Sequence, residues 1–292
     1  MKTRSRWRKI PEASYPVAGA FLKSREALCV GACSRFLARS FKPGHIWSFS
    51  GALASGTDSS GAEREIAAFL LYSRSSLFPI FTGDRNYPLP RFLDRFLRKV
   101  PIYSVQGLIE DTEILEEGIS KRGYAITDRI DYDLMTLDKE PLPSCFNMGP
   151  PGLLIRTATE ADKEGIFPLQ SAYEQEEVIP LGGSFDPENC RKNLSKILAS
   201  EKMMVACLGN KVVGKINTNA KSFTRYQIGG VYVLPQLRGH GIAAKLSAVF
   251  LKELTSQGMG ISLFVKKRNA VARNLYRRLG FTISGDYRIS YY

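Results

Sequence analysis

The spacing of apolar residues changes repeatedly between alternation and helical periodicity, and this mixture predicts an α/β protein with a mixed sheet. In the first half, Phe92, Leu93, Phe96 and Leu97 share one side of a helix that begins at Pro90. The other elements expected there are helices within 17–38, strands at 45–50, 66–72, 77–81 and 102–105, a loop at 55–61, a helix at 110–119, and a hairpin of 124–127 with 130–137.

The second half continues with strand and helix patterns in much the same order. The dipeptide Gly209-Asn210 is of a type that joins two strands of a hairpin. The expected elements are a strand at 153–156, helices around 166–177 and 187–200, strands at 203–208, 212–218 and 226–233, a helix through Leu254, a strand at 261–265, a helix at 270–279 and final strands within 281–291.

Proline and glycine clusters separate these two runs of elements. The stretches Pro141-Leu-Pro143 and Gly149-Pro-Pro-Gly152 break helix and strand alike and are typical of a linker. A chain of 292 residues also exceeds one average domain. We therefore expect a basic, flexible lead at 1–15, an N-terminal α/β domain at 16–148 and a C-terminal domain at 153–292.

One stretch, residues 231–244, combines a strand end, two glycines and a helix start. Gly239 and Gly241 permit tight backbone geometry and the close approach of a ligand. The first turn of the helix that follows has N–H groups without intrahelical partners, and these favour an anion. The stretch therefore predicts a site for a phosphate or pyrophosphate.

Composition narrows the class of protein. Apolar residues make up 44% of the chain, which excludes wholesale disorder, and no apolar run is long enough to cross a bilayer. No apolar core follows the basic N-terminus, so we expect a cytoplasmic protein rather than a secreted one. Five scattered cysteines and two histidines, without a CxxC pair, predict neither a metal site nor a disulfide framework.

The formal net charge of +13 is concentrated in the second half. Residues 1–150 carry 21 basic and 17 acidic side chains, whereas residues 151–292 carry 20 basic and 11 acidic ones. Such a surface attracts a polyanionic cofactor or a nucleic acid. Because no RNA-binding aromatic motif, zinc knuckle or long basic tract is present, we do not expect nucleic acid as a partner.

Two motifs of the second half resemble the GNAT superfamily of N-acetyltransferases. Arg238-Gly-His-Gly-Ile-Ala243 is similar to that family's R/Q-x-x-G-x-G/A loop, and Asn269 to Phe281 reads N-x-x-A-x-x-L-Y-x-x-L-G-F. The pair is far more specific than a glycine loop alone. The resemblance covers 153–292 and implies the GNAT fold and acetyl-coenzyme A (acetyl-CoA) as the cofactor.

The resemblance also implies roles for particular residues. Backbone N–H groups of the loop would hold the pyrophosphate, the preceding strand would pair with the pantetheine arm, and Asn269 would contact the cofactor. Tyr276 would act as general acid toward the departing thiolate, although an amphipathic helix also uses such a tyrosine in its core. The residues implied to bind the cofactor are Val231, Tyr232, Val233, Arg238, Gly239, His240, Gly241, Ile242, Ala243, Ala244 and Asn269.

The general base is less clear from the sequence. The strands at 226–233 and 261–265 contain no carboxylate, although some relatives carry one there. The base is then absent, replaced by a water chain, or supplied by Glu174, Glu176 or Glu177, a run that is also typical of a solvated face. Within the loop we expect His240 to point outward, and the basic run 266–268 either approaches cofactor phosphates or is a solvated turn.

The similar order of elements in the two halves suggests an internal duplication with a degenerate GNAT-like copy at the N-terminus; an unrelated α/β domain is the alternative. The loop expected at the corresponding place, 82–88, carries an acid and a proline, so we expect no coenzyme A there. The sequence thus predicts tandem GNAT-like domains and acetyl transfer to a primary amine of a small molecule or protein. A non-catalytic acyl-CoA sensor is the alternative function.

Overall fold

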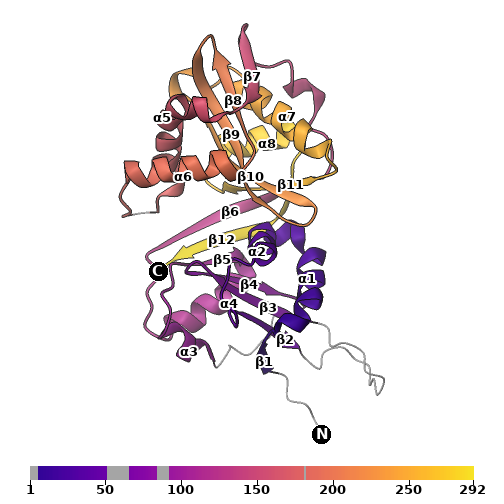
Figure 1. Cartoon of the computed structure of the whole chain (residues 1–292), viewed down its shortest axis with the longest axis vertical. Coiled ribbons are helices and arrows are strands. Elements are labelled where there is room, and N and C mark those ends of the chain that lie inside the picture. Colours follow the sequence, from indigo (N-terminus) through magenta and orange to yellow (C-terminus); the bar gives the residue numbers. More distant parts are fainter. Residues whose placement is uncertain (1–5, 51–65, 84–91, 181) are drawn as a thin grey trace. The chain divides into compact units, whose positions relative to one another are not determined.

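A computed structural model describes residues 6–50, 66–83, 92–180 and 182–292. Its contacts divide the chain into two compact units, Met1–Tyr132 with Gly285–Tyr292, and Asp133–Ser284. We refer to them as the first and the second unit (Figure 1).

The second unit is a mixed sheet covered by helices on both faces. Its sheet has the order β6-β11-β10-β9-β8-β7, and β10 and β11 are parallel while β7 to β10 are antiparallel neighbours. The elements are β7 (Leu153–Thr157), α5 (Lys163–Tyr173), α6 (Pro187–Ser200), β8 (Met203–Leu208), β9 (Lys211–Lys221), β10 (Arg225–Val233), α7 (Ile242–Thr255), β11 (Gly260–Lys266) and α8 (Ala270–Leu279).

Alternation along the strands explains the two helix layers. In β9, Val212 packs in a cluster with residues of α5 and α6, whereas Val213 packs in another cluster with residues of α7. The first of these clusters contains Ile166 and Leu194, and the second contains Leu246. Successive side chains of a strand point to opposite faces, so one buried strand supplies both layers.

The first unit repeats this order of elements. Its sheet runs β1-β2-β3-β4-β5-β12, and β4 and β5 are parallel, as β10 and β11 are in the second unit. The elements are β1 (Arg6–Lys9), α1 (Tyr15–Ser24), α2 (Glu26–Leu37), β2 (Ile46–Ser50), β3 (Ala68–Ser73), β4 (Ser76–Phe81), α3 (Phe92–Leu97), β5 (Ser104–Leu108) and α4 (Ile109–Ser120).

The strands β6 (Asp128–Leu137) and β12 (Thr282–Tyr291) each contribute to both units. The end of β12, Tyr287 to Tyr291, pairs antiparallel with β5, and β6 lies beside β11 in the sheet order. In each unit the sixth strand therefore comes from the other half of the sequence. The predicted domains 16–148 and 153–292 differ from the compact units for this reason, and they remain a prediction.

Three expectations about single elements were wrong. The lead is not wholly flexible, because Trp7 of β1 packs on the rings of Phe49 and Phe81 and draws this strand into the sheet. Residues 124–127 form no strand, since β6 begins only at Asp128. Residues 282–291 form one strand instead of several. The loops expected at 55–61 and, beyond Gly83, at 82–88 lie outside the described residues.

Candidate functional site

The two parallel strands of the second unit separate and open a cleft. Backbone pairing of β10 with β11 covers only Arg225 to Gln227 opposite Gly260 to Ser262, although β10 continues to Val233. The cleft has a volume of about 700 Å³. Of the predicted site residues, all but His240 line it: Val231, Tyr232, Val233, Arg238, Gly239, Gly241, Ile242, Ala243, Ala244, Asn269 and Tyr276.

The glycine loop supplies an anion cradle at one end of the cleft. Gly239 has φ of +83°, and an added Cβ there would meet no atom within 4 Å, so the loop faces open space. Gly241 is the N-cap of α7 with φ of +78°, and no side chain caps the helix. The first N–H groups of α7 thus have neither intrahelical nor side-chain partners. This arrangement fits a pyrophosphate.

Gly241 has a second reason to be glycine. A Cβ at this position would lie 2.9 Å from the backbone nitrogen of Gly149 and 2.9 Å from Cβ of Met148. The loop therefore packs closely on the segment between β6 and β7, and Met148 also lines the cleft. Nothing in the sequence marked Met148 as a site residue, because its role depends on this packing.

His240 is the predicted residue whose side chain does not line the cleft. Its imidazole is exposed, and Nδ1 lies 3.0 Å from the carbonyl oxygen of Arg238. The ring is thus not part of the cleft lining. The contribution of its backbone to cofactor binding remains a prediction.

A β-bulge lies in β10 beside the cleft. The register pairs Gly229 with Asn217 and then Tyr232 with Lys215, so that Gly230 and Val231 stand opposite the single residue Ile216. A bulge turns backbone groups out of the regular ladder and bends the strand. The bulge therefore accompanies the separation of β10 from β11 at the point where Val231 enters the cleft.

The second motif brings Asn269 and Tyr276 to the opposite wall. The side-chain oxygen of Asn269 caps α8 by accepting a hydrogen bond from the Ala272 N–H at 3.0 Å, which leaves its amide nitrogen for other contacts. Tyr276 is 8% exposed and lines the cleft. Burial, and to a smaller extent the neighbouring Tyr173 and Glu177, raise the pKa of Tyr276, so its phenol keeps its proton at neutral pH.

The acidic run folds as a π-helical turn, η4 (Glu174–Val178), which brings two carboxylates to the cleft. Glu176 accepts hydrogen bonds from the Tyr232 hydroxyl at 2.5 Å and from the Arg238 guanidinium at 3.0 Å. Burial opposes the ionisation of Glu176, but these hydrogen bonds outweigh it and lower its pKa. Burial and then the bond to Glu176 raise the pKa of Tyr232 to about 12.

Glu177 links the acidic turn to the second motif. Its carboxylate lies 3.2 Å from the amide nitrogen of Asn269 and 3.1 Å from Nζ of Lys266. Lys266 is thus buried in an ion pair, whereas Lys267 and Arg268 are exposed. Among the described residues, Glu176 and Glu177 are the carboxylates that line the cleft. The sequence placed this run on a helix but did not decide between a site and a solvated face.

A polar row on β9, two members of which are buried, was not predicted from the sequence. Lys215, Asn217 and Asn219 alternate along the strand beside Gly229 and Gly230 of β10. Lys215 and Asn217 are 0% and 1% exposed. The available signal was a lysine and two asparagines at alternate positions opposite a glycine pair, but such a row is more often the solvated face of a strand.

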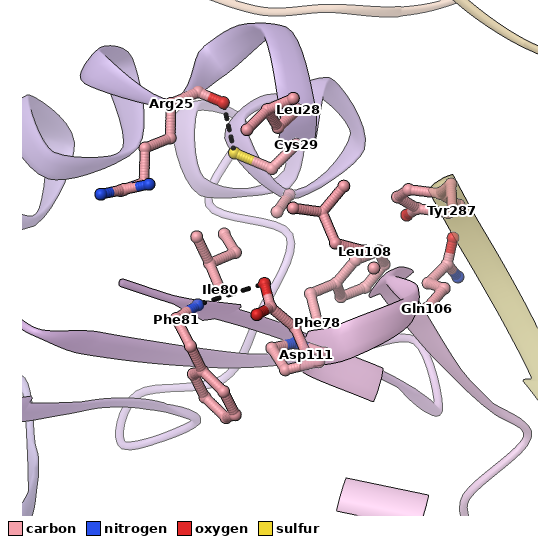
Figure 2. A pocket seen from close by; sticks show the side chains of 13 residues that line it. Arg25, Leu28, Cys29, Phe78, Ile80, Phe81, Gln106, Leu108, Asp111 and Tyr287 are labelled. Carbon is pink, nitrogen blue, oxygen red and sulfur yellow. Dashed lines mark hydrogen bonds between the residues drawn. The ribbon is translucent and has the colours of Figure 1, made fainter. Parts of the chain in front are cut away.

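The corresponding parallel strands of the first unit also separate. Pairing of β4 with β5 covers only Ser76 and Leu77, beyond which side chains of α2 and both strands meet around a cavity of about 20 Å³ (Figure 2). Cys29 and Phe78 are among these side chains, and Asp111 accepts a hydrogen bond from the Phe81 N–H at 3.3 Å. Such a volume holds about one water molecule.

In the described part of the chain, no helix is long and apolar enough to cross a membrane. The same residues contain no group of three or more histidine, cysteine, aspartate or glutamate side chains that could hold a metal ion.

Residues 154–281 match the model of the acetyltransferase (GNAT) family. This segment is a GNAT domain. Members of the family transfer acetyl groups from acetyl-CoA, and the matched residues include the glycine loop and the second motif. No curated protein matches the sequence.

Solved structures extend the likeness to the whole chain. A GCN5-related N-acetyltransferase from Sphaerobacter thermophilus is 18% identical, with 99% of this chain and 96% of that chain covered and a TM-score of 0.60. A Drosophila protein is 12% identical, with 99% of both chains covered and a TM-score of 0.61.

A tandem GNAT protein from the clavulanic acid biosynthesis pathway is 11% identical, with 98% of both chains covered and a TM-score of 0.56. At such identities the likeness concerns the fold alone. Together with the repeated order of elements, it shows two GNAT-like domains in tandem.

Proposed function

We propose that this protein transfers the acetyl group of acetyl-CoA directly to a primary amine, without a covalent enzyme intermediate. One observation carries the proposal: the glycine loop, the bulge of β10 and Tyr276 line a single cleft between the separated strands. These are the groups that acyl transfer from a thioester needs, namely an anion cradle, backbone donors and a proton donor.

Each group has a definite task in this proposal. When bound, acetyl-CoA would supply an activated thioester. The N–H groups of Ile242, Ala243 and Ala244 would bind its pyrophosphate, and Arg238 would add positive charge at the same end. The free edge of β10 at Val231 to Val233 would align the pantetheine arm.

Proton transfers are assigned to side chains that line the cleft. The Tyr276 hydroxyl has no hydrogen-bond partner within the described chain and keeps its proton, so it can protonate the departing sulfur. The amine must lose a proton, and in this proposal Glu176 or Glu177, which line the cleft, receives it directly or through water. The acceptor itself is a primary amine of a small molecule or protein.

The substitution Ala243→Glu tests the cofactor site. It places a carboxylate in the first turn of α7, where a negative charge stabilises the helix but repels a pyrophosphate. We expect acetyl-CoA binding, measured by calorimetry, to be lost while the thermal midpoint is retained. Gln257→Glu, an exposed position beyond the other end of α7, is the matched control and should bind normally.

Activity is measured as thiol release across a panel of primary amines. Product above the rate of acetyl-CoA hydrolysis with at least one amine supports the transferase. Tight binding of acetyl-CoA without turnover of any amine would favour the non-catalytic sensor, and absence of binding would refute both.

A further inference from the structure

The deepest buried charge-bearing side chain of the second unit has no ion-pair partner. Lys215 is 0% exposed, and no carboxylate of the described chain lies within 4.0 Å of its Nζ. Instead, Nζ donates a hydrogen bond to the Gly230 carbonyl oxygen at 2.8 Å and lies 3.4 Å from the side-chain oxygen of Asn217. It also lies 4.7 Å from the centre of the Tyr173 ring.

Such a lysine is costly for stability. Burial lowers the pKa of Lys215 to about 7, and Glu174 and Cys190 oppose this only in part. Replacing a buried polar group by an apolar one of similar size is often neutral or stabilising. The position is therefore better explained by what the lysine holds in place than by its contribution to folding.

What it holds is the first residue of the β10 bulge. Gly230 has φ of +62°, and an added Cβ would lie 2.0 Å from Oδ1 of Asn217 and 2.8 Å from Nζ of Lys215. The Tyr173 hydroxyl lies in the same surroundings, because the Gly230 backbone lowers the pKa of Tyr173 against the rise that burial causes. Three side chains from α5 and β9 thus surround one peptide, and the next residue, Val231, lines the cleft.

Hydrogen bonds along β9 hold the side chains around Gly230 in place. The Asn217 amide donates to the Asn219 side-chain oxygen at 2.9 Å and to the Thr218 carbonyl oxygen at 3.0 Å. At Gly229, a Cβ would lie 2.2 Å from Nδ2 of Asn219. Side chains at Gly229 and Gly230 would occupy the space that Asn217 and Asn219 fill, so the row requires glycine at both positions.

We propose that Lys215 is a positioning residue for acyl transfer, which, with Asn217 and Tyr173, fixes the Gly230–Val231 bulge so that the Val231 backbone faces the reacting end of the cleft. The inference rests on the proposed function, which places the thioester beside this bulge. A donor fixed before the reaction begins stabilises developing charge without reorganisation, and a displacement of about 1 Å can cost about a hundredfold in rate.

The test compares the wild-type protein with Lys215→Met and Tyr173→Phe. Lys215→Met keeps the length of the side chain but cannot donate to Gly230, and it leaves no charge unpaired. We expect kcat with an amine found in the panel to fall about tenfold to a hundredfold. The Kd for acetyl-CoA and the KM for the amine should stay within about threefold, because the cradle and acceptor contacts are unchanged.

Each other result would overturn the inference. An unchanged kcat would remove the positioning role. A rise in the amine KM alone would make Lys215 a substrate contact, and a parallel loss of acetyl-CoA binding would make it a structural residue. If the methionine variant does not fold, Tyr173→Phe is judged by the same outcomes, since it removes the hydroxyl that interacts with the Gly230 backbone.

A spectroscopic measurement separates this inference from the proposed function. In protein labelled with ¹⁵N-valine, the Val231 amide resonance should move in the Lys215→Met variant while that of Val105, in β5 of the first unit, stays in place. An unmoved Val231 resonance refutes the positioning role even if the wild type is an active acetyltransferase. A wild type that neither binds acetyl-CoA nor acetylates an amine refutes the proposed function, whatever the resonance does.

Discussion

The buried Lys215 predicts an unusual pH dependence of stability. Burial lowers the pKa of this side chain from its ordinary value of 10.5 to about 7 in the folded protein. Between these two values the unfolded chain binds a proton that the folded chain has released. The free energy of unfolding of the wild type should therefore rise with pH above 7. Below pH 7 both the folded and the unfolded state hold the proton, and the buried charge of Lys215 then destabilises the folded protein most.

The magnitude follows from the pKa difference. Each pH unit inside the window contributes about 1.4 kcal/mol per proton. From pH 7, where the folded side chain is half ionised, to pH 9, the gain is about 2 kcal/mol. Lys215→Met removes this pH-dependent contribution to the free energy of unfolding. Glu174 and Cys190, which act electrostatically on Lys215, remain in both proteins.

The assay is urea unfolding of the wild type and Lys215→Met at pH 6, 7, 8 and 9, followed by fluorescence. The free energy of unfolding of the wild type should increase relative to that of the variant by about 2 kcal/mol between pH 7 and pH 9. At pH 6 the variant should be at least as stable as the wild type. Parallel curves, or a wild type that gains stability toward low pH, would refute the reasoning that Lys215 is buried without a counter-ion.

Three further predictions concern the site. Tyr276→Phe should lower kcat about a hundredfold or more by removing the general acid, while calorimetry shows unchanged acetyl-CoA binding; undiminished turnover would reject the role. Gly230→Ala should cost about 2 kcal/mol or more in urea unfolding, since φ is +62° and Asn217 blocks the added Cβ. Gly209→Ala, at φ of +55° in open space, should cost only about 1 kcal/mol, and equal losses would contradict the clash. Calorimetry should give one acetyl-CoA per chain, because the cavity where β4 and β5 separate has a volume of only about 20 Å³; a stoichiometry of two would disprove this.

Sequence reasoning identified the cofactor side of the site because that side is local. The glycine loop and the start of α7 are contiguous, and their use depends on backbone N–H groups that any sequence with this geometry exposes. Asn269 caps α8 and Tyr276 lies seven residues further on in the same helix, so helical periodicity places both on the same wall. Eleven of the twelve predicted residues accordingly line one cleft.

Other features were decided by contacts between distant segments. From the sequence alone, the acidic run at 174–177 could be a solvated face. The structure instead pairs Glu176 with Arg238 and Glu177 with Lys266. The row of Lys215 and Asn217 could equally face water, because alternation cannot tell which side of a strand is covered. The bulge shifts the register of β10 by one residue, and this shift places the Gly230 carbonyl oxygen beside Nζ of Lys215.

By itself, therefore, the sequence determined the element order, the α/β class and the chemistry that the loop and helix motifs can offer. The tertiary structure decided which strands complete each sheet, since β12 at the end of the chain pairs with β5 from the first half, and which polar groups are buried. The physical reason is that helix starts and glycine loops are determined by neighbouring residues. Strand partners and burial instead depend on the free energy of whole layers packing together.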